Sequence, residues 1–151
     1  MVDIELLKKL RNETLAGIAD CRKALEETRG DYKKAIEWIR EKGLEKAAKK
    51  SDRETSQGLV ESYIHQNGRV GALVEVLCET DFVARTDVFK NLVHEICMQA
   101  AAMNPKDVKS LLAQDYIRDA SKTIDSLIKE AIAKLGENIV VKRLQRFEIG
   151  S

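Results

Sequence analysis

The hydrophobic pattern of this chain changes its period at Gly58. Upstream, apolar residues recur every three to four positions, the spacing that places them on one face of a helix. Downstream, two runs rich in β-branched and apolar residues, 59–65 and 69–78, flank the dipeptide Asn67-Gly68. Asn-Gly accepts positive φ at both central positions of a tight turn, so this arrangement is a strong signal for a β-hairpin. A chain with both periods in this order is neither all-helical nor all-β.

Three short helices are predicted before the change of period. Their apolar stripes are Val2, Leu6, Leu7 and Leu10; Ile18, Cys21 and Leu25; and Ala35, Ile36 and Ile39. Gly30 ends the second helix, and Asp31 can cap the third because its carboxylate accepts from the free N–H groups of a first turn. The third helix is expected to end near Gly43. Residues 1–45 are therefore interpreted as a three-helix module, and residues 46–57 as a helical or frayed linker.

Residues 58–151 are predicted to form one α+β core. In the second strand of the hairpin, both faces carry apolar residues, which is typical of a strand inside a sheet. The next apolar stripe, from Phe89 to Met103, ends at Asn104-Pro105, and the last stripe ends at Gly136. Residues 139–149 are interpreted as a closing strand, whereas 106–122 could be a short helix with a loop or an edge strand. The predicted order is ββαxαβ, an antiparallel sheet packed by helices.

Composition argues against several classes of protein. Lys and Arg number 26 against 25 Asp and Glu, and so balanced a surface does not attract a polyanion, so direct nucleic-acid binding is not expected. No run approaches the roughly 20 apolar residues of a membrane-spanning helix. The start, Met1-Val2-Asp3-Ile4-Glu5, lacks the basic and apolar regions of a secretory signal. Three cysteines without a C-x-x-C pair favour reduced thiols and a cytoplasmic location.

Catalytic chemistry has one candidate pair. His94 and Cys97 lie three residues apart on a predicted helix, so they could form a Cys–His pair. Cys97 also lies on the apolar stripe of that helix, where a buried thiol behaves as a small hydrophobe with a raised pKa, and this interpretation is favoured. The chain has no Gly-rich phosphate loop, no H-E-x-x-H motif and no metal-spaced Cys/His cluster. No enzymatic activity, cofactor or metal is therefore expected.

The segment 79–85 stands between a strongly apolar strand and a strongly periodic helix. Thr80 or Asp81 is a good N-cap for that helix. Phe82 then has two interpretations. It could be the staple that packs the helix on the sheet, or it could be an aromatic side chain presented on a rigid junction, as an interaction hot spot requires. The residues alone leave both open.

Four motifs, in order along the chain, carry a resemblance to a known family. The segment Thr80-Asp81-Phe82-Val83-Ala84 resembles the T-D-F-V-A signature of bacterial elongation factor Ts. The other three are Leu10-Arg11-Asn12-Glu13-Thr14-Leu15-Ala16-Gly17 with Asp20-Cys21-Arg22-Lys23-Ala24-Leu25, then Ala47-Ala48-Lys49-Lys50, and finally Ile132-Ala133-Lys134-Leu135-Gly136-Glu137-Asn138-Ile139. The resemblance covers nearly the whole chain, from about Leu6 to Phe147.

This resemblance implies a guanine-nucleotide exchange factor for elongation factor Tu, without covalent chemistry of its own. The N-terminal helices would form a ubiquitin-associated-like module that docks on the GTPase domain of the partner. By position, Arg11, Ile18 and Ala19 would contact that domain. The segment Thr80-Asp81-Phe82-Val83 would carry the exchange function, with Asp81 and Phe82 reaching toward the nucleotide site and disturbing the Mg²⁺ ion and the phosphate-binding loop.

His65 raises the question of a second copy of the chain. Taken alone, a histidine at the end of a hairpin strand is a solvated turn residue. Tyr63-Ile64-His65, however, resembles a strand motif from a second core subdomain that long family members carry. This chain has one core only, and short members are similar to half of that pair and complete it as homodimers. A homodimer through the sheet is therefore expected, in which one protomer presents Asp81-Phe82 and the other presents His65. A plain protein-binding adaptor built on the helical module remains the alternative.

Two local departures from the family pattern are visible. Leu15 stands where the family has glycine, so this turn is not expected to use the glycine's positive-φ conformation at low cost. The stretch from Pro105 to Leu127 is short and leaves no room for the long helical insertion found in many members.

Overall fold

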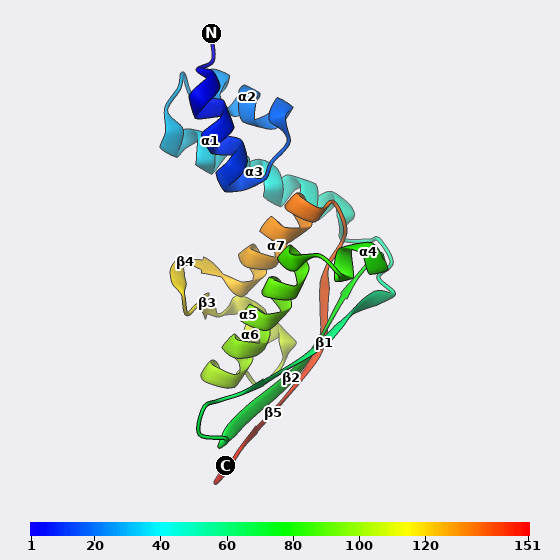
Figure 1. Ribbon diagram of the computed structural model, residues 1–151. Coiled ribbons are helices and arrows are strands. Elements are labelled where there is room, and N and C mark those ends of the chain that lie inside the picture. Colours follow the sequence, from blue (N-terminus) through cyan, green and yellow to red (C-terminus); the bar gives the residue numbers. More distant parts are fainter.

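The computed structural model describes residues 1–151 and is an α+β protein with a helical N-terminal module, as predicted (Figure 1). The module contains α1 (Ile4–Thr14), α2 (Ile18–Glu27) and the first half of α3 (Tyr32–Lys50). The core follows with β1 (Gln57–Ile64), β2 (Val70–Cys78), α4 (Asp81–Ala84), α5 (Asp87–Met103), α6 (Val108–Ala113), β3 (Asp115–Tyr116), β4 (Asp119–Thr123), α7 (Ile124–Leu135) and β5 (Val140–Glu148). None of these helices is both long and apolar enough to cross a membrane.

The core sheet is antiparallel, with strands in the order β1-β2-β5. The predicted hairpin is confirmed: the His65 N–H donates to the Val70 carbonyl oxygen (2.9 Å), and Gly68 turns the chain at φ 71°. β2 is the central strand, as its apolar pattern predicts. The closing strand is also confirmed as β5, which lies beside β2 although more than 60 residues separate them in the sequence.

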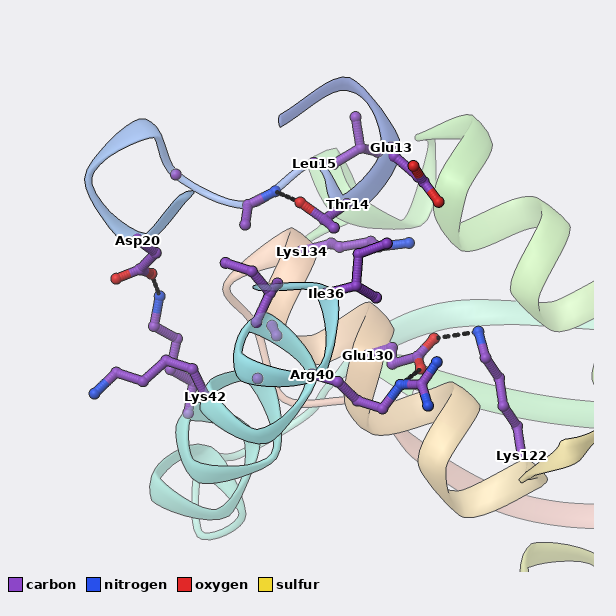
Figure 2. Close-up of a pocket in the computed structure, with 16 residues that line it drawn as sticks. Glu13, Thr14, Leu15, Asp20, Ile36, Arg40, Lys42, Lys122, Glu130 and Lys134 are labelled. Carbon is purple, nitrogen blue, oxygen red and sulfur yellow. Dashed lines mark hydrogen bonds and ion pairs between the residues drawn. The ribbon is translucent and has the colours of Figure 1, made fainter. Parts of the chain in front are cut away.

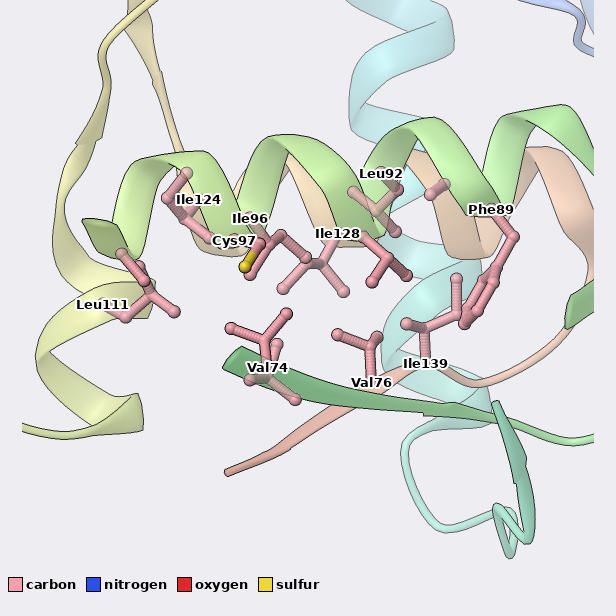
Figure 3. Packing of buried hydrophobic residues seen from close by; sticks show 14 of the residues in the cluster. Val74, Val76, Phe89, Leu92, Ile96, Cys97, Leu111, Ile124, Ile128 and Ile139 are labelled. Carbon is pink, nitrogen blue, oxygen red and sulfur yellow. The ribbon is translucent and has the colours of Figure 1, made fainter. Parts of the chain in front are cut away.

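One face of the sheet is covered by α5 and α7, and the main core lies between them (Figures 1 and 3). Val74 and Val76 of β2 point into this layer, where they meet Phe89 and Ile96 of α5 and Ile128 of α7. All five side chains are buried. The buried residues are every second residue along the strand and every third or fourth residue along the helices. The apolar residues whose spacing is visible in the sequence are therefore the ones that form this core.

The opposite face of the sheet has no helix on it (Figure 1). We call this the open face and define it by Val60, Ile64, Leu73 and Phe147, whose side chains are all exposed. Phe147 lies opposite Gly71, whose other neighbour is Ile64, so all three strands contribute to an apolar patch at the hairpin end of this face. Further along the face, Val60 lies beside Glu75, which pairs with Arg143 (2.7 Å). The prediction that β2 has apolar residues on both faces is correct, but one of those faces is left to solvent within a single chain.

The third helix does not end near Gly43, so that prediction was wrong. α3 continues through Gly43 to Lys50. Gly43 does not form a turn; it is buried where α3 packs against α7, and its role is close packing. A Cβ atom added at Gly43 would lie 3.2 Å from the Cβ of Ala133. The first five residues of the expected linker, 46–50, therefore belong to α3, and the helix that completes the module also packs on the core.

The turn between α1 and α2 has the positive-φ geometry that was expected to be costly without a glycine. Leu15 adopts the left-handed conformation (φ 57°, ψ 16°) that glycine adopts without cost, and its N–H donates to the Arg11 carbonyl oxygen at 2.8 Å. This bond closes the C-terminus of α1. The side chain of Leu15 is exposed and makes no core contact in this position.

The ambiguous stretch 106–122 contains α6 and the small β3–β4 hairpin. The buried side chain of Gln99 on α5 holds this segment in place. Its amide nitrogen donates to the backbone oxygen of Asp115 (3.0 Å), and its amide oxygen accepts from the N–H of Ile117 (3.0 Å). The region is thus a compact connection rather than an extended insertion.

Candidate functional site

The α4 turn, which we define as residues 79–85, projects from the core at the end of β2 (Figure 1). Phe82 is its most exposed large side chain, with 77% of its surface accessible. The residues around it are anchored: Ala84 is buried, and Val83 packs against the main core. The turn therefore presents an aromatic ring to solvent from a base that is fixed by packing.

The staple interpretation of Phe82 is wrong, because a residue that packed α5 on the sheet would be buried. Phe89, seven residues later, fills the core position instead and is 0% exposed. The N-cap assignment also needs correction. Thr80 caps only the short α4, where its Oγ1 accepts from the N–H of Val83 (3.3 Å), and Thr86 caps the periodic helix α5 by accepting from the N–H of Phe89 (3.2 Å).

Arg85 is a member of the site that the sequence analysis did not single out. Its guanidinium forms an ion pair with the carboxylate of Asp81, one turn earlier. The same guanidinium carbon lies 5.8 Å from the centre of the Phe82 ring. Asp81 and Phe82 are thus held side by side by one cation. Both groups are exposed, so these contacts orient the side chains and contribute little to stability.

The proposed docking residues of the module lie on a separate surface. Arg11 is in the last turn of α1, while Ile18 and Ala19 form the first turn of α2. All three side chains are exposed, and Ile18 is a large apolar residue with no cover. A shallow hollow beside Ile18 and Ala19 is bounded by Arg22, Lys23, Glu26 and Glu27. The module therefore offers an apolar spot inside a charged rim.

His65 lies directly after β1, at the end of the sheet opposite to the α4 turn (Figure 1). It is exposed, and its ring centre is 6.4 Å from that of Tyr63. β2, with nine residues, separates the two sites, which corresponds to about 30 Å at the usual rise per residue. One chain does not bring His65 and Phe82 together.

The three thiols are structural. Cys21, Cys78 and Cys97 are all buried and unpaired. Burial raises the pKa of the Cys97 thiol to about 11, and its sulfur contacts the carbonyl oxygens of Glu61 (3.5 Å) and Ala72 (3.4 Å) rather than His94, which is exposed. Burial also raises the pKa of Cys21 and Cys78. A protonated, enclosed thiol is a poor nucleophile. No three His, Cys, Asp or Glu side chains lie together in a group that could hold a metal ion.

A hollow of about 320 Å³ lies between the module and the core (Figure 2). Glu130 of α7 stands on its wall and pairs with Arg40 of α3 (3.6 Å) and with Lys122 of β4 (3.1 Å). On the module side, Lys46 of α3 pairs with Asp20 of α2. These ion pairs connect α3 to its neighbours on both sides, so the helix that carries the module also contacts the core.

Comparison with known proteins identifies the family. A family model described as elongation factor Ts matches residues 79–151, which begin at the α4 turn. A protein named elongation factor Ts from Thermoanaerobacter sp. (strain X514) is 46% identical, and the alignment covers 99% of this chain and 96% of that protein. The chain belongs to the elongation factor Ts family. The elongation factor Ts of Synechocystis sp. is 43% identical over 99% of this chain and 89% of its own length.

The elongation factor Ts of Nostoc sp. (strain PCC 7120) is 52% identical over 148 residues, which cover 98% of this chain but 47% of that protein. Family members thus differ considerably in length. The alignments with the Thermoanaerobacter and Synechocystis elongation factor Ts proteins extend over 195 residues, more than the 151 of this chain. Those two relatives therefore contain residues that have no counterpart here.

Proposed function

We propose that this protein is the guanine-nucleotide exchange factor of elongation factor Tu and acts in translation elongation. The observation that supports this most directly is the exposed ring of Phe82 on an anchored turn. A folded protein that leaves one aromatic side chain uncovered, with its neighbours buried, has the geometry of an interaction hot spot. The surrounding segment is the T-D-F-V-A signature of the family, and an adaptor has no need of it.

The proposed mechanism needs no covalent step. In the partner, Mg²⁺ and backbone N–H groups hold the diphosphate of GDP, so a side chain that displaces either one weakens nucleotide binding. Phe82 would enter between helices of the partner, and the carboxylate of Asp81 would approach the same region. Thermodynamic linkage requires GDP to weaken binding of the factor by the same ratio as the factor weakens binding of GDP.

The N-terminal module would provide the docking contact. Ile18 and Ala19 supply a small apolar surface, and Arg11 supplies an exposed positive charge at the end of α1. Because α3 is continuous from the module into the core, docking of the module also places the core and its α4 turn on the partner. The module is proposed to be a ubiquitin-associated-like domain, with residues 1–45 as module, 46–57 as linker and 58–151 as dimerisation core.

We further propose that two chains associate through their open faces. At its hairpin end the open face is apolar across three strands: Leu73 on the central strand is 47% exposed and Phe147 on the edge strand is 69% exposed. Single chains rarely leave a continuous apolar surface of this kind uncovered. A two-fold dimer would be self-complementary, since each open face meets the same face of the other copy. In such a dimer, His65 of one protomer and Phe82 of the other would both belong to the surface that binds elongation factor Tu.

The proposed location is the cytoplasm, where its partner functions. The partner is a protein, and neither nucleic acid nor a membrane is required. Three unpaired, buried thiols suit a reducing compartment.

The decisive experiment is release of a fluorescent GDP analogue from purified elongation factor Tu, with this protein at substoichiometric amounts. The unmodified protein should accelerate release with turnover, and Phe82→Ala should remove most of that acceleration. Met103→Ala is the matched control, because Met103 is also a large apolar residue at the surface (49% exposed) but lies at the far end of α5. It should exchange like the unmodified protein.

Two results would contradict the proposal. Binding without acceleration would assign the chain to the adaptor class. Equal loss of activity in Phe82→Ala and Met103→Ala would show that the effect of Phe82 is not specific to the α4 turn. A strict monomer at micromolar concentration, measured by sedimentation, would refute the dimer alone.

A further inference from the structure

We propose that Glu137 is a positioning residue for Phe82: its carboxylate fixes the direction in which the α4 turn presents the ring. The inference rests on the proposed exchange function and extends it to a residue on a different element. Glu137 lies in the loop between α7 and β5, far from the turn in sequence. It does not belong to the segment that would touch the partner.

The contacts of Glu137 are concentrated on the start of the turn. One carboxylate oxygen, Oε1, accepts from the backbone N–H groups of Glu79 (3.1 Å) and Thr80 (2.9 Å). The other oxygen, Oε2, accepts from the hydroxyl of Thr80 (2.7 Å). Hydrogen bonds to a charged acceptor are stronger than neutral ones, and here three donors converge on one side chain.

The hydroxyl of Thr80 links this carboxylate to the helix that carries Phe82. The hydroxyl donates its hydrogen to Glu137. The hydroxyl oxygen is therefore free to accept a hydrogen bond from the N–H of Val83, which makes Thr80 the N-cap of α4. The carboxylate therefore sets the rotamer of the cap, and the cap sets the first turn of α4. Phe82 lies inside that turn, so its direction depends on Glu137 without direct contact.

A second set of bonds fixes the loop that carries Glu137. The N–H of Asn138 donates to the carboxylate of Glu79 (2.6 Å), so the two segments exchange hydrogen bonds in both directions. The buried amide of Asn138 donates to the backbone oxygen of Arg53 (2.9 Å), just after α3. The guanidinium of Arg53 lies 3.5 Å from the Glu79 carboxylate. The turn is thus tied to the segment that leaves the N-terminal module.

Three variants separate a geometric role from a simple charge effect. Glu137→Gln keeps one oxygen at the same reach, so it can still accept from the two backbone N–H groups. Its NH2 group replaces the oxygen that accepts from the Thr80 hydroxyl and can donate to that hydroxyl's oxygen instead, which still ties the cap to residue 137. Exchange should therefore stay within about threefold of the unmodified protein. Glu137→Asp keeps the charge but is one methylene shorter, so exchange should fall about tenfold or more. Glu137→Ala should lose at least as much. The measurement is the rate of fluorescent GDP release from elongation factor Tu.

Two further readouts are independent of overall folding. Amide hydrogen exchange of Glu79 and Thr80 should accelerate in Glu137→Asp but not in Glu137→Gln. In a double-mutant cycle, adding Glu137→Asp to Phe82→Ala should lower the rate by less than about twofold, because the residue acts through Phe82. Glu95→Ala is the matched control: Glu95 is also a partly buried carboxylate that accepts a hydrogen bond, from the guanidinium of Arg118 (2.8 Å), but it lies on α5 away from the turn.

The outcomes are decisive in either direction. Glu137→Asp more active than Glu137→Gln would overturn the inference, as would full additivity with Phe82→Ala or an equal loss in Glu95→Ala. If Phe82→Ala itself leaves exchange unchanged, the proposed function of the turn fails, while the amide exchange of Glu79 and Thr80 still reports whether Glu137 holds the turn. The two failures are therefore distinguishable.

Discussion

The exposed position of Phe82 predicts that its removal has little effect on stability. With 77% of its surface accessible, only about a quarter is covered, and full burial of a phenylalanine contributes about 1.5–3 kcal/mol, so the covered part contributes roughly 0.5 kcal/mol. The contact with Arg85 adds about 0.5 kcal/mol at an exposed site. Alanine regains up to about 0.5 kcal/mol as a better helix former. Phe82→Ala should therefore cost under about 1 kcal/mol of unfolding free energy.

The matched comparison is Phe89→Ala, which removes a ring of the same size at 0% exposure. A fully buried phenylalanine costs about 3–5 kcal/mol when truncated, because a cavity remains. Urea denaturation followed by circular dichroism measures both variants under the same conditions. For a chain of this length, each kcal/mol lost from the free energy of unfolding lowers the melting temperature by about 2–4 °C.

A loss of 3 kcal/mol or more in Phe82→Ala would refute this reasoning, since it would mean that the ring packs in the core in solution. Small losses in both variants would show that the core of Figure 3 is not the main source of stability. The expected pattern, a stable Phe82→Ala protein that no longer promotes exchange, would separate presentation of the ring from folding.

Three further predictions follow from the packing. Leu73→Glu places a charge on the central strand of the open face, and sedimentation should show a monomer where the unmodified protein is expected to sediment as a dimer. Gly43→Leu forces a side chain between α3 and α7, and urea denaturation should show a loss of about 1–3 kcal/mol. Burial raises the pKa of the Cys97 thiol from its ordinary value of 9.0 to about 11. The stability contributed by the protonated thiol is therefore complete below pH 9 and is lost as the pH rises toward 11. In Cys97→Ala the urea midpoint should decrease less as the pH rises over this range, and an unchanged pH dependence would contradict this prediction.

Elements whose residues interact with near neighbours were predictable from the sequence. The β1–β2 hairpin follows from Asn67-Gly68, since the turn chemistry is contained in two residues. α5 and α7 follow from their apolar stripes and from their ends at Asn104 and Gly136, both of which adopt the left-handed conformation. The T-D-F-V-A motif lies at the junction of β2 with the following helices, as its place between an apolar strand and a periodic helix predicts.

Features that depend on contacts between distant segments were not predictable in this way. Gly43 was interpreted as a helix end because glycine is the common local reason for one, whereas its actual role is close packing against Ala133, 90 residues later. The two interpretations of Phe82 could not be separated either. A staple and a presented ring have the same local sequence, and only the burial of Phe89 and the exposure of Phe82 distinguish them.

The sequence by itself therefore determined the elements of this protein, their order and its family, because periodicity, caps and motifs are properties of short segments. The tertiary structure alone decided which sheet face stays open, how far α3 extends, and that Glu137 reaches the turn of Phe82. Hydrogen bonds between residues 57 positions apart leave no local pattern in a single sequence. They exist only once the folded chain brings the α7–β5 loop beside the end of β2.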